Sequence, residues 1–138
     1  MNNAILASYY KVWISYFLEY GNFKRVEILL EQMQQLVQQC NKRNMIVFCN
    51  TLYFICLSKY NVLSSRDLNN TEQFFASLVN SNNGMVYSVV GMYYLALIAL
   101  DKGLNDVALK RCEFVFQHAN KLKYKEKAEQ IILKLKSN

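Results

Sequence analysis

Residues 92–115 read MYYLALIALDKGLNDVALKRCEFV, and this stretch indicates the fold more clearly than any other. Apolar residues fill positions 92–100, shortly before Gly103, and after the glycine they recur every three or four positions, at Ala108, Cys112 and Val115. Recurrence at that spacing is typical of an amphipathic helix, and a glycine between two such segments is typical of a helix end. The stretch therefore predicts two helices joined by a glycine turn.

The same pattern occurs around Gly21, which lies 82 residues before Gly103. Its apolar positions are Tyr10, Trp13, Ile14 and Phe17 before the glycine and Val26, Leu30 and Met33 after it. Asn61 closes a third apolar run, 40 residues after the first glycine and 42 before the second. Such equal spacing predicts repeated helical hairpins, each of which buries its apolar face against its neighbours.

The composition agrees with a helical, globular chain. The 138 residues include no proline and only four glycines, so little interrupts long helices. Hydrophobic residues make up 53% of the chain and aromatic residues 14%, which excludes intrinsic disorder. We therefore expect an all-α fold, and a chain of this length buries a core of its own.

We expect one domain over residues 1–138, built as a right-handed array of three antiparallel hairpins. The hairpins are predicted at about 4–40, 45–80 and 85–122, with a capping helix at about 124–136, which makes about seven helices. In each hairpin the first helix is apolar almost all round and is expected to be covered, whereas the second is amphipathic. Asn22 and Asn105 are expected to cap second helices, and Asn70 with Gln73 resembles a capping box.

Several kinds of site are not expected. Met85 to Leu100 is the longest apolar run, but its sixteen residues fall short of the ~20 that a membrane span needs. The four cysteines form no CxxC pair, and His118 is the sole histidine, so no metal is predicted. No nucleotide-binding glycine loop is present, and no cofactor is predicted. Free cysteines and no recognisable secretory signal lead us to expect a reducing, cytoplasmic setting.

Leu95, Ala96, Gly103 and Ala108 match the large, small, glycine and small positions of the tetratricopeptide-like (TPR-like) helical repeat, which this chain resembles. Trp13, Ile14, Gly21 and Val26 match the same positions more loosely. The units here run near 41 residues without proline, whereas the family's repeat is about 34 residues and usually ends in proline. Long repeats of this sort resemble the ligand-sensing part of peptide-responsive bacterial regulators.

The resemblance implies a partner-binding groove lined by the first helix of each hairpin. The ligand-facing positions of the family fall here on Ser8, Lys11, Ser15, Thr51, Ser58, Tyr93 and Leu97. Flanking tyrosines and phenylalanines make an apolar, tyrosine-rich concave face that suits a partner helix or peptide. We expect a non-enzymatic binding module, for which a chaperone, an immunity protein and the sensing domain of a transcription regulator are all compatible roles. A homodimer contact is the other reading of the tyrosines.

A second class of function is catalysis. Arg111 and His118 have the spacing of arginine, six residues and histidine that resembles the signature of HEPN ribonucleases, in which the pair activates an RNA 2′-hydroxyl. Cys112 stands where that family favours a polar residue, directly after the arginine. The lysines of residues 121–127 alternate with other residues, and we interpret them as a solvated face. Nucleic acid is therefore not the expected partner.

Overall fold

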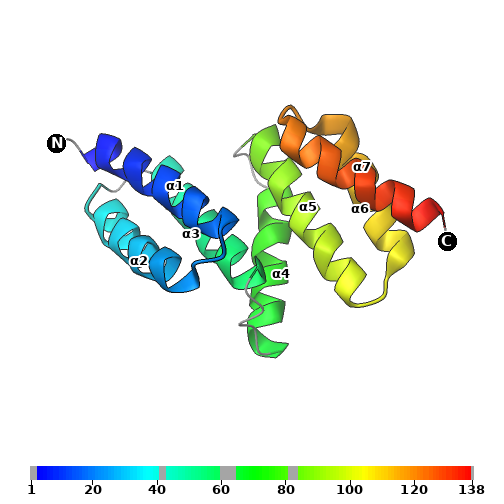
Figure 1. Cartoon of the computed structure of the whole chain (residues 1–138), viewed down its shortest axis with the longest axis horizontal. Coiled ribbons are helices and arrows are strands. Elements are labelled where there is room, and N and C mark those ends of the chain that lie inside the picture. Colours follow the sequence, from blue (N-terminus) through cyan, green and yellow to red (C-terminus); the bar gives the residue numbers. More distant parts are fainter. Residues whose placement is uncertain (1–2, 41–42, 60–64, 81–83, 138) are drawn as a thin grey trace. The chain divides into compact units, whose positions relative to one another are not determined.

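Seven helices make up the described part of the chain, and no strand occurs there (Figure 1). The computed structural model describes residues 3–40, 43–59, 65–80 and 84–137, without the side chains of residues 3–4, 7, 18–19, 23, 40, 43–45, 56–59 and 65–67. The helices are α1 (Asn3–Glu19), α2 (Phe23–Cys40), α3 (Arg43–Lys59), α4 (Ser65–Val79), α5 (Met85–Asp101), α6 (Asn105–His118) and α7 (Leu122–Lys136). The predicted all-α class with seven helices is confirmed, whereas the right-handed hairpin array stays a prediction.

The chain divides into two compact units, and each is described by itself. Unit 1 is Met1–Leu63 and contains α1, α2 and α3, whereas unit 2 is Ser64–Asn138 and contains α4 to α7. The division falls inside residues 45–80, the range predicted as the second hairpin. The hairpins expected at 4–40 and 85–122 each lie within one unit.

Two glycines form the corners between consecutive helices, as the sequence predicts. Gly21 follows α1 and Gly103 follows α5, with φ angles of 74° and 76°. After α5, Leu104 N–H donates to Ala99 O at 2.9 Å and Gly103 N–H donates to Leu100 O at 3.0 Å. This pair of hydrogen bonds is a Schellman motif, which satisfies carbonyl groups left free at the helix end.

The helix starts agree with the sequence at one position and differ at two. Asn22 caps α2 as expected, because its side-chain Oδ1 accepts a hydrogen bond from Arg25 N–H at 3.3 Å. The expected cap at Asn105 is wrong, since α6 begins at that residue and Leu104 precedes it without a side-chain cap. The expected start at Asn70 is also wrong, because α4 begins five residues earlier, at Ser65.

Unit 1 has its core where α2 packs between α1 and α3. The spacing of Val26, Leu30, Met33 and Val37 places these side chains on one face of α2, and all four are buried. Ile14 of α1 and Cys49 and Leu52 of α3 complete the cluster. Unit 1 therefore has a core made from all three of its helices.

Unit 2 is organised around α5, which packs against α4, α6 and α7. Eight of its seventeen residues are buried, which explains a helix that is apolar almost all round. Gly91 lies so close to α4 that a β-carbon there would be 2.7 Å from the Phe75 carbonyl oxygen. Lys102, directly after α5, also forms an ion pair with Glu72 of α4 at 2.6 Å. Among the described helices, none combines the length and apolar character that crossing a membrane requires.

Candidate partner-binding surface

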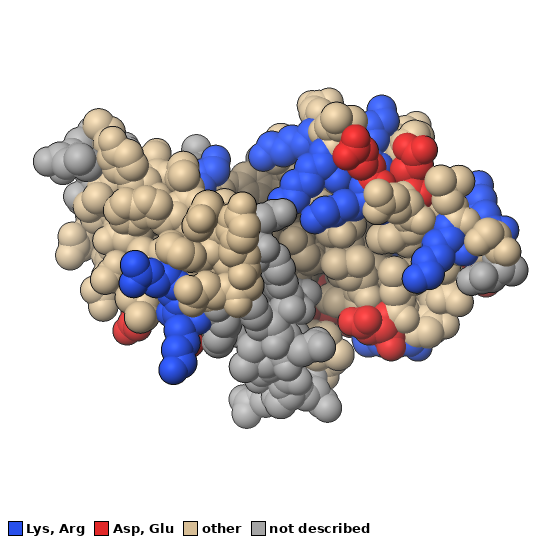
Figure 2. Space-filling model, viewed as in Figure 1, with Lys and Arg blue, Asp and Glu red and all other residues tan. Residues whose placement is uncertain are grey.

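The exposed side of α1 carries an unusual concentration of large apolar residues. Five residues of α1 and Tyr20, which directly follows the helix, are between 48% and 71% exposed: Ile5, Tyr9, Val12, Trp13, Tyr16 and Tyr20. At about 100° per residue, these positions cover about 100° of the helix circumference and form one continuous stripe, which we call the α1 face. Figure 2 shows few charged side chains over the part of the molecule where α1 lies. Contiguous apolar surface of this kind marks interaction sites.

The α1 face is exposed because α1 has few neighbours. It packs closely against α2, and among its described side chains Ile14 is the one that is buried in the core. By contrast, α5 is covered by three helices of its own unit. The expectation that every first helix is covered holds for α5 and does not hold for α1.

Aromatic side chains on the α1 face contact one another, which restricts their rotamers. Tyr9 and Trp13 stack with centroids 6.3 Å apart, and Tyr16 and Tyr20 contact each other at 4.7 Å. Because each ring restricts its neighbour, less side-chain freedom is lost when a partner binds. Tyrosine and tryptophan are also the residues that most often supply binding energy at interfaces. The α1 face therefore has both the chemistry and the order of a docking surface.

Three of the predicted partner-binding residues lie on α1 beside this face. Ser8, Lys11 and Ser15 are all exposed, and their spacing places them along one line of the helix. Lys11 Nζ lies 5.1 Å from the ring centroid of Phe48 in α3, which is a cation–π contact. These three residues thus share one side of α1, on which Ser8 and Ser15 lie nearer to the α1 face and Lys11 is turned toward α3.

The other predicted partner-binding residues do not join them. Thr51 is buried in α3, and its hydroxyl donates to Val47 O at 2.7 Å. Tyr93 is buried in the core of unit 2, and Leu97 is partly buried against the same core. The Ser58 side chain lies outside the described residues. The sequence pattern placed Tyr93 on a ligand-facing line because it could not show that α7 covers that part of α5.

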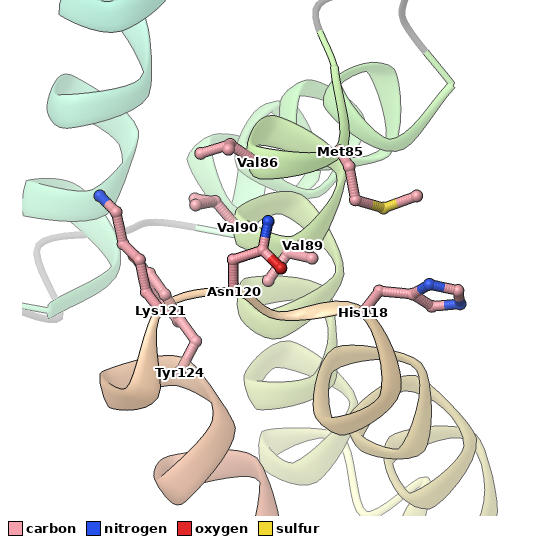
Figure 3. A pocket seen from close by; sticks show the side chains of 8 residues that line it. All are labelled: Met85, Val86, Val89, Val90, His118, Asn120, Lys121 and Tyr124. Atoms are coloured by element: carbon pink, nitrogen blue, oxygen red, sulfur yellow. The ribbon is translucent and has the colours of Figure 1, made fainter.

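A small pocket lies in unit 2 where the chain passes from α6 to α7 (Figure 3). Its lining includes Val86, Val89 and Val90 from α5, with His118, Lys121 and Tyr124 from the α6–α7 region. Its volume of about 20 Å³ has room for one or two water molecules. Ligand pockets for small molecules are typically ~300–1,000 Å³, so this pocket does not accommodate a substrate of that size.

Arg111 and His118 make separate contacts on α6. Arg111 Nη1 donates to the Leu95 carbonyl oxygen of α5 at 2.8 Å, and Arg111 is not among the residues that line the pocket. His118 packs on Phe114, with ring centroids 4.5 Å apart. Figure 3 shows the His118 ring pointing away from the Tyr124 side chain. The Arg111 guanidinium therefore links α6 to α5, and the two side chains do not converge on the described pocket.

The two described cysteines are buried, and burial raises the pKa of both Cys49 and Cys112 from 9.0 to about 11. Both thiols are consequently protonated near neutral pH, whereas a nucleophilic cysteine needs a lowered pKa. Within residues 3–40, 43–59, 65–80 and 84–137, no cluster of three His, Cys, Asp or Glu side chains could hold a metal ion.

Lysines surround the start of α7. Lys123 Nζ lies 5.9 Å from the Tyr124 ring centroid, and Lys125 Nζ lies 5.2 Å from that of Phe116. Over unit 2, Figure 2 shows acidic side chains among the basic ones. This mixture is typical of a solvated helix surface rather than of a phosphate-binding patch.

Comparison of the chain with protein-family models, curated proteins and solved structures finds no match in any of the three.

Proposed function

We propose that this protein is a non-enzymatic interaction module that holds a partner helix or peptide against the α1 face. The observation that carries the proposal is the stripe of six exposed apolar residues along α1 and its C-terminal end at Tyr20, four of them aromatic. A stripe along one helix suits another helix or an extended peptide, because such partners present apolar side chains at matching intervals. Ser8 and Ser15 would provide part of the polar rim that interfaces usually have, and the predicted binding residue Lys11 would lie further round the helix.

The proposed binding surface differs from the groove that the sequence predicts, which would be lined by the first helix of every hairpin. The proposal places the binding energy on tyrosine and tryptophan side chains of α1 and gives Tyr93 a structural role. The protonated, buried thiols of Cys49 and Cys112 suit a reducing compartment, and we propose the cytoplasm as the setting. The proposal needs no cofactor or metal.

The test compares the tagged protein with a Tyr9→Lys/Tyr16→Lys variant after recovery from native cells. Both substituted residues are exposed, so folding is expected to survive, which circular dichroism checks. Ile28→Lys is the matched control, because Ile28 is 54% exposed on α2 of the same unit. We expect a protein or peptide, including a second copy of this chain, to co-purify with the parent and the control and not with the double variant.

Two results would contradict the proposal. Equal recovery of every associated protein by the double variant would show that the α1 face binds none of them. Recovery of RNA together with RNA cleavage that is lost in His118→Ala would favour the HEPN-like alternative, in which Arg111 and His118 are catalytic.

A further inference from the structure

The six residues of the α1 face are arranged symmetrically along the helix. Ile5 and Tyr20, Tyr9 and Tyr16, and Val12 and Trp13 are three pairs that share the same midpoint, between Val12 and Trp13. A two-fold axis through that midpoint places Tyr9 opposite Tyr16 and Ile5 level with Tyr20 in a second, antiparallel copy of α1, and it brings Val12 and Trp13, which lie on opposite flanks of the stripe, beside their own counterparts. A two-fold interface requires this property, because residue i contacts residue j while j contacts i.

We propose that the α1 face is occupied by the α1 face of a second copy of this chain, packed antiparallel about this axis. The inference depends on the proposed function, since it names the partner of the same surface. It assigns Tyr9 to Tyr16 of the other copy and Ile5 to Tyr20, and it places Val12 beside Val12 and Trp13 beside Trp13 next to the axis.

The facing side chains are complementary in kind. One pair combines a large aromatic residue with a smaller aliphatic one, Tyr20 with Ile5. Alternation of large and small side chains is how facing helices fill the space between them. The remaining pair joins Tyr9 to Tyr16, and two aromatic rings gain from edge-to-face or offset contact.

The exposed area is sufficient for a weak dimer. Four aromatic side chains of ~150–250 Å² each, about half exposed, together with Ile5 and Val12, offer about 500 Å² per copy. Two copies bury about 1,000 Å², which is the lower limit for a specific interface. We therefore expect a dimer that dissociates at roughly micromolar concentration.

Electrostatics favour the same arrangement. None of the six residues is charged, so no like charges meet across the axis. Two antiparallel helices also place the positive end of one helix dipole beside the negative end of the other. The occupant that fits an uncharged, self-complementary stripe is thus another copy of that stripe.

The test is a charge exchange measured by sedimentation equilibrium on the full chain. In the proposed register, position 9 of one copy meets position 16 of the other. The Tyr9→Lys/Tyr16→Lys variant then opposes two pairs of lysines, and the Tyr9→Glu/Tyr16→Glu variant opposes two pairs of glutamates. We expect each variant alone to dissociate at least about tenfold more readily than the parent, and an equal mixture of the two to form a heterodimer. Ile28→Lys, on α2, should dimerise like the parent.

Three outcomes would overturn the inference: a parent chain that stays monomeric up to ~100 μM, well above the micromolar dissociation expected here, a lysine variant that dimerises as well as the parent, or a mixture that forms no heterodimer. The two experiments together distinguish failure of the dimer proposal from failure of the proposed function. If the parent is monomeric but the lysine variant loses a co-purifying protein, the α1 face binds a different chain and the proposed function stands. If the parent is monomeric and the variant loses nothing, both proposals fail.

Discussion

Tyr93 of α5 and Tyr124 of α7 meet edge to face, with ring centroids 5.3 Å apart and planes at 69°. Burial raises the pKa of both phenols, and for Tyr124 a hydrogen bond with Tyr94 acts in the opposite direction. Tyr94 in turn stacks on Phe75 of α4 at 5.0 Å. A chain of aromatic contacts thus joins α4, α5 and α7 inside unit 2.

Replacing Tyr93 should therefore destabilise the fold. We expect Tyr93→Ala to lower the free energy of unfolding by about 3–5 kcal/mol, because a buried aromatic ring is removed and a cavity remains. Urea unfolding followed by circular dichroism measures the change. Leu122→Ala is the control, since Leu122 is 66% exposed and should alter stability by less than ~0.5 kcal/mol. If the Tyr93 variant were as stable as this control, Tyr93 would not be part of the core, and its predicted role in partner binding would be favoured instead.

The close approach of α4 to α5 depends on Gly91. A β-carbon at this position would meet the Phe75 backbone carbonyl, which cannot turn aside as a flexible side chain could. Crowding a packed core costs about 1–3 kcal/mol, and better helix propensity returns about 1 kcal/mol. We expect Gly91→Ala to lower the free energy of unfolding by about 1 kcal/mol and Gly91→Val to lower it more. Stabilisation by Gly91→Ala in thermal unfolding would mean that the two helices lie further apart.

Gly103 is required for a different reason. No atom lies within 4 Å of a β-carbon built at this residue, so any effect of substitution must come from its φ of +76°. We expect Gly103→Ala to lower the free energy of unfolding by about 1–2 kcal/mol, the cost of a left-handed conformation with a β-carbon. Gly103→Asn should lose less, because asparagine tolerates that region. Equal losses for the two variants in urea unfolding would contradict this explanation.

The buried thiols predict a dependence of stability on pH. Cys49 and Cys112 have pKa values raised from 9.0 to about 11 in the folded protein, so the unfolded chain releases these protons first. Their contribution to stability is complete below pH 9 and is lost as pH rises from 9 to about 11. Urea unfolding between pH 8 and pH 10.5 should show a shallower decline for Cys49→Ala/Cys112→Ala than for the parent. Parallel declines would show that the thiols are already ionisable in the folded state.

The sequence predicts the helices well because the relevant signals are local. Gly21 and Gly103 have positive φ and close the helices before them, as their positions between apolar runs indicate. The start of α4 at Ser65 could not be predicted, because residues 65–70 are polar apart from Leu68 and their helical state does not follow from apolar periodicity. The close approach of α4 at Gly91 could not be predicted either, because a glycine inside a helix indicates close packing only when the neighbouring helix is known.

The candidate surface was predictable only in part. Ser8, Lys11 and Ser15 are on the exposed side of α1, which their regular spacing indicates. Tyr9 and Tyr16 are exposed, as expected of tyrosines that flank a binding face, whereas the exposure of Trp13 could not be predicted. An apolar helix with three neighbours and one with few neighbours can have similar compositions. Tyr93 illustrates the converse, since a helix distant in sequence covers it.

Trp13 is the sole tryptophan of the chain and lies about half exposed beside the midpoint of the α1 face. Excitation at a wavelength that tyrosine scarcely absorbs therefore reports on this one position in the unlabelled protein. Occupation of the surface would remove water from the indole and move its emission to shorter wavelength. The native chain thus carries its own fluorescent reporter for whatever docks on α1.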